Sequence, residues 1–152
     1  MNIILLICLN ITIVDQLIKM GVSSLSNNIE VIKDFFNITY AENTGAAFSI
    51  LNNSRFFLIL MGFGAVIMVM FFFIKNKKQT KLSIASYGIL LGGIVGNLFD
   101  RIKYGYVIDY LDFRIFGYNF PIFNLADIAI VIGCFLLIIM FMMEDKNGNK
   151  NN

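Results

Sequence analysis

The hydrophobic positions of this chain fall into four long runs, separated by polar connections. Each run is long enough to cross about 30 Å of hydrocarbon at a rise of about 1.5 Å per residue. We therefore predict an all-α membrane protein with four transmembrane helices, at approximately residues 3–21, 56–74, 83–99 and 124–143.

Composition agrees with a membrane protein of one domain over residues 1–152. Hydrophobic residues make up 58% of the chain and charged residues 14%, whereas about a quarter of an ordinary soluble domain is charged. The net charge of +2 is too small to indicate nucleic-acid binding. Cys8 and Cys134 lie inside apolar runs and the chain has no His, so we expect no disulfide, no metal site and no cofactor.

Four lysines lie between the second and third hydrophobic runs, in the segment KNKKQTK. Short basic loops remain on the cytoplasmic side of a membrane. We therefore expect the loop 75–82, the N-terminus and the tail 144–152 to be cytoplasmic. The loops 22–55 and 100–123 then lie outside.

Both outer loops show strand-like patterns. Residues 31–51 mix β-branched and aromatic residues around an Asn-Thr-Gly turn signal, which predicts short strands that lie on the membrane surface and form a small extracytoplasmic sheet. Residues 106–116 also alternate, but at helical spacing they present an apolar face. A short interfacial amphipathic helix is therefore an alternative for the second loop.

Polar and ionisable side chains gather near the outer ends of three of the four predicted helices. Such residues are costly inside a membrane and are usually functional. Nothing comparable occurs at the inner ends, so we expect a polar site at the outer boundary. Its members are Asp15, Lys19, Asn97, Asp100, Asn124 and Asp127.

Paired aspartates would give this site a definite chemistry. Two carboxylates held close together share a proton, so that one acts as a base toward water while the other protonates a carbonyl or leaving group. The candidates are Asp100, Asp109 and Asp127, with Asp112 as a further one. Spacing alone does not choose the pair. In a structural alternative, Asp100 pairs with Arg101 or Arg114 and Asp127 caps the fourth helix.

Two smaller patterns also allow two interpretations. Asp15 and Lys19 are four residues apart, which suits either a structural ion pair or a pair that orients a substrate head group. Asn43, Thr44 and Gly45 form either a simple turn or, with the following alanines, a place where a substrate backbone approaches closely.

Other function classes explain the chain less well. A small transporter or proton conductor would need polar groups that continue toward the inner face. Residues 66–73 and 135–143 are instead almost purely apolar. A membrane adaptor would leave the clustered aspartates unexplained.

Four blocks of the sequence, taken in order and spacing, resemble one family, lipoprotein signal peptidase (signal peptidase II). The resemblance covers nearly the whole chain. The blocks are DQLIK from Asp15, ENTGAAFS from Glu42, GGIVGNLFDR from Gly92 with VIDYLDF from Val107, and FNLAD from Phe123.

The resemblance implies an intramembrane aspartic endopeptidase that removes signal peptides from prolipoproteins just before their diacylglyceryl-modified cysteine. Its catalytic aspartates match Asp109 and Asp127. The other matched positions would form the polar pocket around this pair: Asp15, Lys19, Asn43, Gly45, Asn97, Asp100, Arg101 and Asn124.

The resemblance also implies a setting for the protein. A β-cradle and an extracytoplasmic helix would lie on the four-helix core, at the outer face of the bacterial cytoplasmic (inner) membrane. We expect diacylglyceryl-prolipoprotein and membrane lipid as partners, and a monomer.

Overall fold

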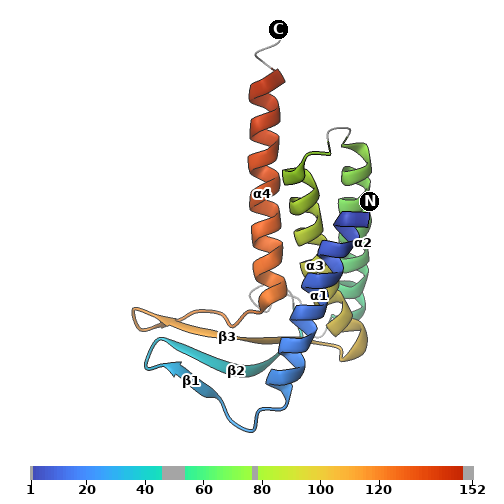
Figure 1. Ribbon diagram of the computed structural model, residues 1–152. Coiled ribbons are helices and arrows are strands. Elements are labelled where there is room, and N and C mark those ends of the chain that lie inside the picture. Colours follow the sequence, from blue (N-terminus) through green and yellow to red (C-terminus); the bar gives the residue numbers. More distant parts are fainter. Residues whose placement is uncertain (1, 46–53, 77–78, 149–152) are drawn as a thin grey trace.

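The computed structural model describes residues 2–45, 54–76 and 79–148, and it contains four long helices and a four-stranded sheet. Figure 1 shows the helices side by side, with the sheet at one end and both termini and the α2–α3 connection toward the other. The helices are α1 (Asn2–Ser23), α2 (Arg55–Lys75), α3 (Lys81–Lys103) and α4 (Leu125–Gly148).

The four predicted membrane helices are confirmed, because all four helices are long and apolar enough to cross a membrane. The third continues beyond residue 99 to Lys103, so Asp100 and Arg101 lie in its last turns and not in a loop. Thr80 begins this helix by accepting a hydrogen bond from the backbone of Ser83.

Helix α3 is the centre of the bundle. In its apolar membrane-spanning stretch, 61% of the residues are buried, against 17–22% in the other three helices, whose apolar surfaces face outward. Glycines allow α3 and α4 to approach closely: a Cβ at Gly93 would collide with the backbone of Ala126, and one at Gly133 with Leu90. Small residues serve this purpose in membrane helices, where packing drives association.

The sheet joins both outer loops. Its antiparallel strands are β1 (Ile29–Ile32), β2 (Phe36–Asn43), β3 (Val107–Ile115) and β4 (Tyr118–Asn119), in that spatial order. The small sheet expected from the first outer loop is therefore confirmed. The β2–β3 register pairs Ala41 with Asp109 and Asn43 with Val107, which brings the Asn-Thr-Gly segment beside Asp109.

The helical alternative for residues 106–116 is wrong, because Val107–Ile115 is a strand. Its backbone pairs with β2, a segment far away in sequence, and periodicity within the loop alone cannot reveal such a partner. Outside α1 to α4, the residues that the structure describes form no further helix. Residues 46–51 of the predicted strand segment lie outside the described residues.

Candidate active site

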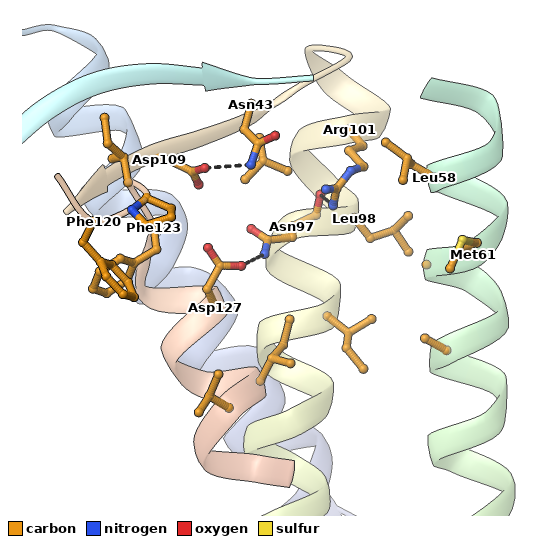
Figure 2. Close-up of a pocket in the computed structure, with 18 residues that line it drawn as sticks. Asn43, Leu58, Met61, Asn97, Leu98, Arg101, Asp109, Phe120, Phe123 and Asp127 are labelled. Atoms are coloured by element: carbon orange, nitrogen blue, oxygen red, sulfur yellow. Dashed lines mark hydrogen bonds between the residues drawn. The ribbon is translucent and has the colours of Figure 1, made fainter. Parts of the chain in front are cut away.

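A cavity of about 460 Å³ opens between α2, α3 and α4, beside the N-terminal end of β3, where Val107 and Asp109 lie. Apolar side chains from all three helices form most of its wall. Figure 2 shows the polar side chains gathered at the end nearest the sheet, with both candidate aspartates pointing into the same space. These polar residues are Asn43, Asn97, Arg101, Asp109 and Asp127.

Asp109 reaches the cavity from β3, and only 3% of it is exposed. Its Oδ1 accepts a hydrogen bond of 2.6 Å from the Asn124 amide, and its Oδ2 accepts one of 2.9 Å from the Asn43 amide. Burial raises the pKa of the Asp109 carboxyl to about 6, and the nearby Asp127 charge also raises it, whereas the two amide bonds lower it. Asp109 therefore retains a proton at a pH where an ordinary aspartate has lost it.

Asp127 lies in the first turn of α4 and is partly exposed to the cavity. Its Oδ1 accepts a hydrogen bond of 2.7 Å from the Asn97 amide, and its Oδ2 accepts one of 3.2 Å from the backbone of Asn124. The Asn124 side chain in turn accepts from the backbone of Asp127 at 2.9 Å. Asp127 thus takes part in a reciprocal cap of α4 while it faces the cavity.

All of the first amides of α4 have side-chain acceptors. The Asn124 and Asp127 amides bond to each other's side chains, the Leu125 amide donates to the Tyr110 hydroxyl, and the Ala126 amide donates to Asp15. Because these groups have no partner within the helix, their capture attaches the start of α4 to α1 and β3. The position of Asp127 follows from these attachments.

Lys19 lies at the centre of a buried ion cluster. Its ammonium is 2.8 Å from Asp15 and 2.7 Å from Asp100, and all three side chains are at most 1% exposed. Asp100 also accepts hydrogen bonds from the Gln16 amide and from the backbone of Ile108. The suggested pairing of Asp100 with Arg101 or Arg114 is wrong, since its ion partner is Lys19.

The Asn97 amide connects the ion cluster to Asp127. Its Oδ1 accepts from Lys19 at 3.0 Å and from Asn124 at 3.1 Å, so its nitrogen must face Asp127. The amide orientation is therefore determined by its partners and is not arbitrary.

Arg101 closes the polar end of the cavity. Its guanidinium donates to the carbonyl of Gly45 at 2.8 Å, and the Gly45 amide donates to the Asn43 side chain at 3.0 Å. Among the described residues, Arg101 Nε is the one buried side-chain nitrogen or oxygen without a hydrogen-bond partner.

All ten predicted site residues belong to one connected network, but they divide into two groups. Asp109, Asp127, Asn43, Asn97 and Arg101 line the cavity. The remaining residues lie outside the lining and connect to it through hydrogen bonds and ion pairs: Asp15, Lys19, Gly45, Asp100 and Asn124. Asp112, the further candidate, is outside the cavity lining and accepts from the Thr39 hydroxyl.

Sequence reasoning missed several residues of the site. Gln16 contacts Asp100, and its position directly after Asp15 was a usable signal. The apolar wall was also missed. It includes Leu58, Met61, Phe120 and Phe123, of which the last two belong to the apolar run directly before Asn124.

Comparison with known proteins identifies consistent relatives. A family model described as Signal peptidase (SPase) II matches residues 7–143. A lipoprotein signal peptidase of Halothermothrix orenii is 38% identical over 147 residues, which cover 95% of this chain and 98% of that protein. One of Clostridium tetani is 44% identical over 80% of this chain and 79% of its own length.

Solved structures agree with these relatives. A bacterial membrane enzyme determined by the in meso method at 2.3 Å resolution superposes with a TM-score of 0.87 and 35% sequence identity, over 97% of this chain and 92% of that one. A second such enzyme, at 1.9 Å resolution, gives a TM-score of 0.82.

Proposed function

Because this chain belongs to the signal peptidase II family of bacterial membrane proteases, we propose that it removes signal peptides from prolipoproteins with Asp109 and Asp127 as its catalytic pair. One observation carries the assignment of the pair. Among the described residues, Asp109 and Asp127 are the only acidic side chains that line the cavity. Asp15 and Asp100 are already occupied by Lys19.

The substrate of this proposal is a prolipoprotein carrying a diacylglyceryl group, cleaved just before the modified cysteine. The apolar wall from α2, α3 and α4 suits a signal helix and acyl chains, which pass from lipid to such a surface without desolvation of polar groups. Polar side chains occur at one end of the cavity, where the scissile peptide would lie beside the two carboxylates.

The two carboxylates divide the proton transfers. Asp127 takes a proton from a water molecule, whose oxygen attacks the scissile carbonyl carbon, while the protonated Asp109 donates its proton to the carbonyl oxygen. Collapse of the tetrahedral intermediate breaks the C–N bond: the proton held by Asp127 passes to the leaving nitrogen, and Asp109 takes a proton back from one hydroxyl of the intermediate, which leaves the carboxylic acid product and restores both carboxyl groups. The raised pKa of Asp109 supports its role as the initial acid.

Arg101 and Asn97 are suited to assist from the same wall. The unpartnered Nε of Arg101 is a buried donor available to a substrate carbonyl or to the polar part of the lipid. The Asn97 amide holds Asp127 in place. Donors directed at developing negative charge in a water-poor site are usually a large part of catalysis.

We propose further that the protein acts as a monomer in the bacterial cytoplasmic membrane, with both termini inside and the catalytic pair at the outer face. Lys75 and Lys81 flank the α2–α3 connection, and the sheet lies at the opposite end of the bundle. Because basic connections favour the cytoplasmic side, this arrangement supports an outer position for the sheet and the cavity.

A cleavage assay on purified protein tests the proposal. A prolipoprotein, with and without its diacylglyceryl group, is incubated with the parent protein, with Asp109→Asn, with Asp127→Asn and with Asp112→Asn. Asp112 is the matched control, because it lies on the same strand as Asp109 but outside the cavity lining.

We expect the parent and Asp112→Asn to cleave only the lipidated form, and the other two variants to cleave neither form. Normal cleavage by folded Asp109→Asn or Asp127→Asn would refute the catalytic pair. Equal cleavage of both substrate forms would refute the proposed lipid requirement.

A further inference from the structure

The turn between β3 and β4 combines an unusual backbone with an unusual side chain. Ile115 pairs with Tyr118, so the turn consists of Phe116 and Gly117. Both have positive φ, at 50° and 80°, which is the pattern of a type I′ hairpin. Asn-Gly is the preferred sequence for this turn, and a bulky residue at positive φ is strained.

Folding of the chain does not explain Phe116. Its side chain is fully exposed, with a relative exposure of 105%, so it contributes no burial within the chain. An aromatic residue that is both strained and fully exposed suggests a partner outside the chain.

The apolar surface around Phe116 continues onto a membrane helix. We define the hairpin surface as the exposed side chains of Ile115, Phe116, Tyr118 and Phe120. Phe120 also lines a groove together with Val131 and Ile132, two exposed residues of α4, and Asp127 is the one polar residue among the described residues that line it. Because α4 has the length and hydropathy of a membrane span, the hairpin surface extends a surface that faces lipid.

The hairpin also lies at a suitable level. Figure 1 shows β3 running across the helix ends and away from the bundle, with the returning chain on the side of β3 nearer to α4 and β1 on the opposite side. Only residues 120–124 separate β4 from α4, so β4 cannot lie far from the boundary where α4 enters the membrane.

We propose that the hairpin surface is a bilayer-contact site, in which Phe116 inserts at the boundary between lipid headgroups and acyl chains. Tyr118 is of a residue type enriched at this boundary, and the exposed Arg114, two residues before Phe116, is a cation that anionic lipid phosphates would attract. The inference rests on the membrane-spanning arrangement and not on the catalytic pair.

The contact has a consequence for the cavity. Asp109 lies near the N-terminal end of strand β3, and Phe116 directly follows its C-terminal end. Lipid contact at the tip would therefore hold the sheet at a constant height above the bundle, and with it Asp109 relative to Asp127.

The chain contains no tryptophan, so a single introduced tryptophan reports on its own surroundings. Phe116→Trp, Val31→Trp and Phe72→Trp are each reconstituted in bilayer nanodiscs, and their quenching by brominated acyl chains and by aqueous acrylamide is measured. Val31 is the matched control, an exposed apolar residue on β1, the strand farthest from β4. Phe72, exposed on α2, is the lipid reference.

We expect the tryptophan at 116 to be quenched by brominated lipid and protected from acrylamide, with the tryptophan at 31 showing the reverse. Equal behaviour of the two would overturn the proposal. Acrylamide access at 116 that is lost only after a lipopeptide substrate is added would also overturn it, because the surface would then bind substrate and not the bilayer.

A second variant separates lipid contact from folding. Phe116→Asn supplies the residue preferred in this turn, so the melting temperature should stay equal to that of the parent or rise. A Tyr118→Trp reporter should lose its quenching by brominated lipid in the Phe116→Asn background. A clear fall in melting temperature, or unchanged quenching, would contradict the proposed role of Phe116.

Discussion

The side-chain amide nitrogen of Asn97 lies 2.7 Å from Oδ1 of Asp127, while its side-chain oxygen accepts a hydrogen bond from Lys19. If this amide group flipped, its nitrogen would face the Lys19 ammonium, which has no acceptor. An ammonium has donors only, so Lys19 requires the Asn97 oxygen, and Asp127 receives the nitrogen. The buried ion cluster of α1 and α3 thereby determines which hydrogen bond one carboxylate of the proposed catalytic pair receives.

Asn97→Ala should lower kcat by about 10- to 100-fold, the range expected for losing a hydrogen bond to a charged group. Asn10→Ala is the matched control, since the exposed Asn10 amide bonds only within its own helix. An unchanged kcat in Asn97→Ala would argue against control of Asp127 by Asn97.

The pH dependence of cleavage should follow Asp109. If the pair needs one shared proton, kcat/KM should fall about tenfold per pH unit above the Asp109 pKa of about 6. Asn43 donates to Asp109 and lowers its pKa, so Asn43→Ala should move this descending limb to higher pH. A shift to lower pH would contradict the assignment.

Lys19→Met should destabilise the fold by about 3–5 kcal/mol, because Asp15 and Asp100 would remain buried without their counter-charge. Thermal unfolding in detergent measures this change. Adding Asp15→Asn and Asp100→Asn to Lys19→Met should recover a large part of the loss. If the triple variant is no more stable than Lys19→Met, charge imbalance is not the cause.

Gly93→Ala should lower both stability and cleavage. Its Cβ would collide with the backbone of Ala126, so α4 must shift, and α4 carries Asp127. Overpacking of this kind costs about 1–3 kcal/mol. Gly64→Ala is the control, because a Cβ at Gly64 meets no atom within 4 Å. Equal effects of the two substitutions would exclude the collision as the reason.

Much of the fold was accessible from sequence, but the architecture of the second outer loop was not. The four spans follow from long apolar runs, which local composition reveals directly. Asp109 lies on a strand because β2 supplies its backbone partners from some 70 residues earlier in the chain, and helical and strand spacing both fit the loop when it is considered alone.

Site residues could likewise be collected but not sorted. The cost of charge near the membrane identified Asp15, Asp100 and Asp127 as members of a polar site, and the chemistry of paired carboxylates added Asp109. Which of them share an ion partner depends on the faces that α1 and α3 present to each other, and these faces also involve Gln16 and Asn97. The choice of Asp109 and Asp127 as catalytic pair remains a prediction, now supported by their common cavity.

By itself, then, the sequence determined that this is a membrane protein of four spans with a polar cluster at one end, because hydropathy and charge act on each segment independently of its neighbours. Only the tertiary structure decided that Lys19 neutralises Asp15 and Asp100 while Asp109 and Asp127 face an open cavity. The physical reason is that ion pairing and desolvation depend on distances between α1, α3, α4 and β3, which are distant in sequence and meet only in the folded chain.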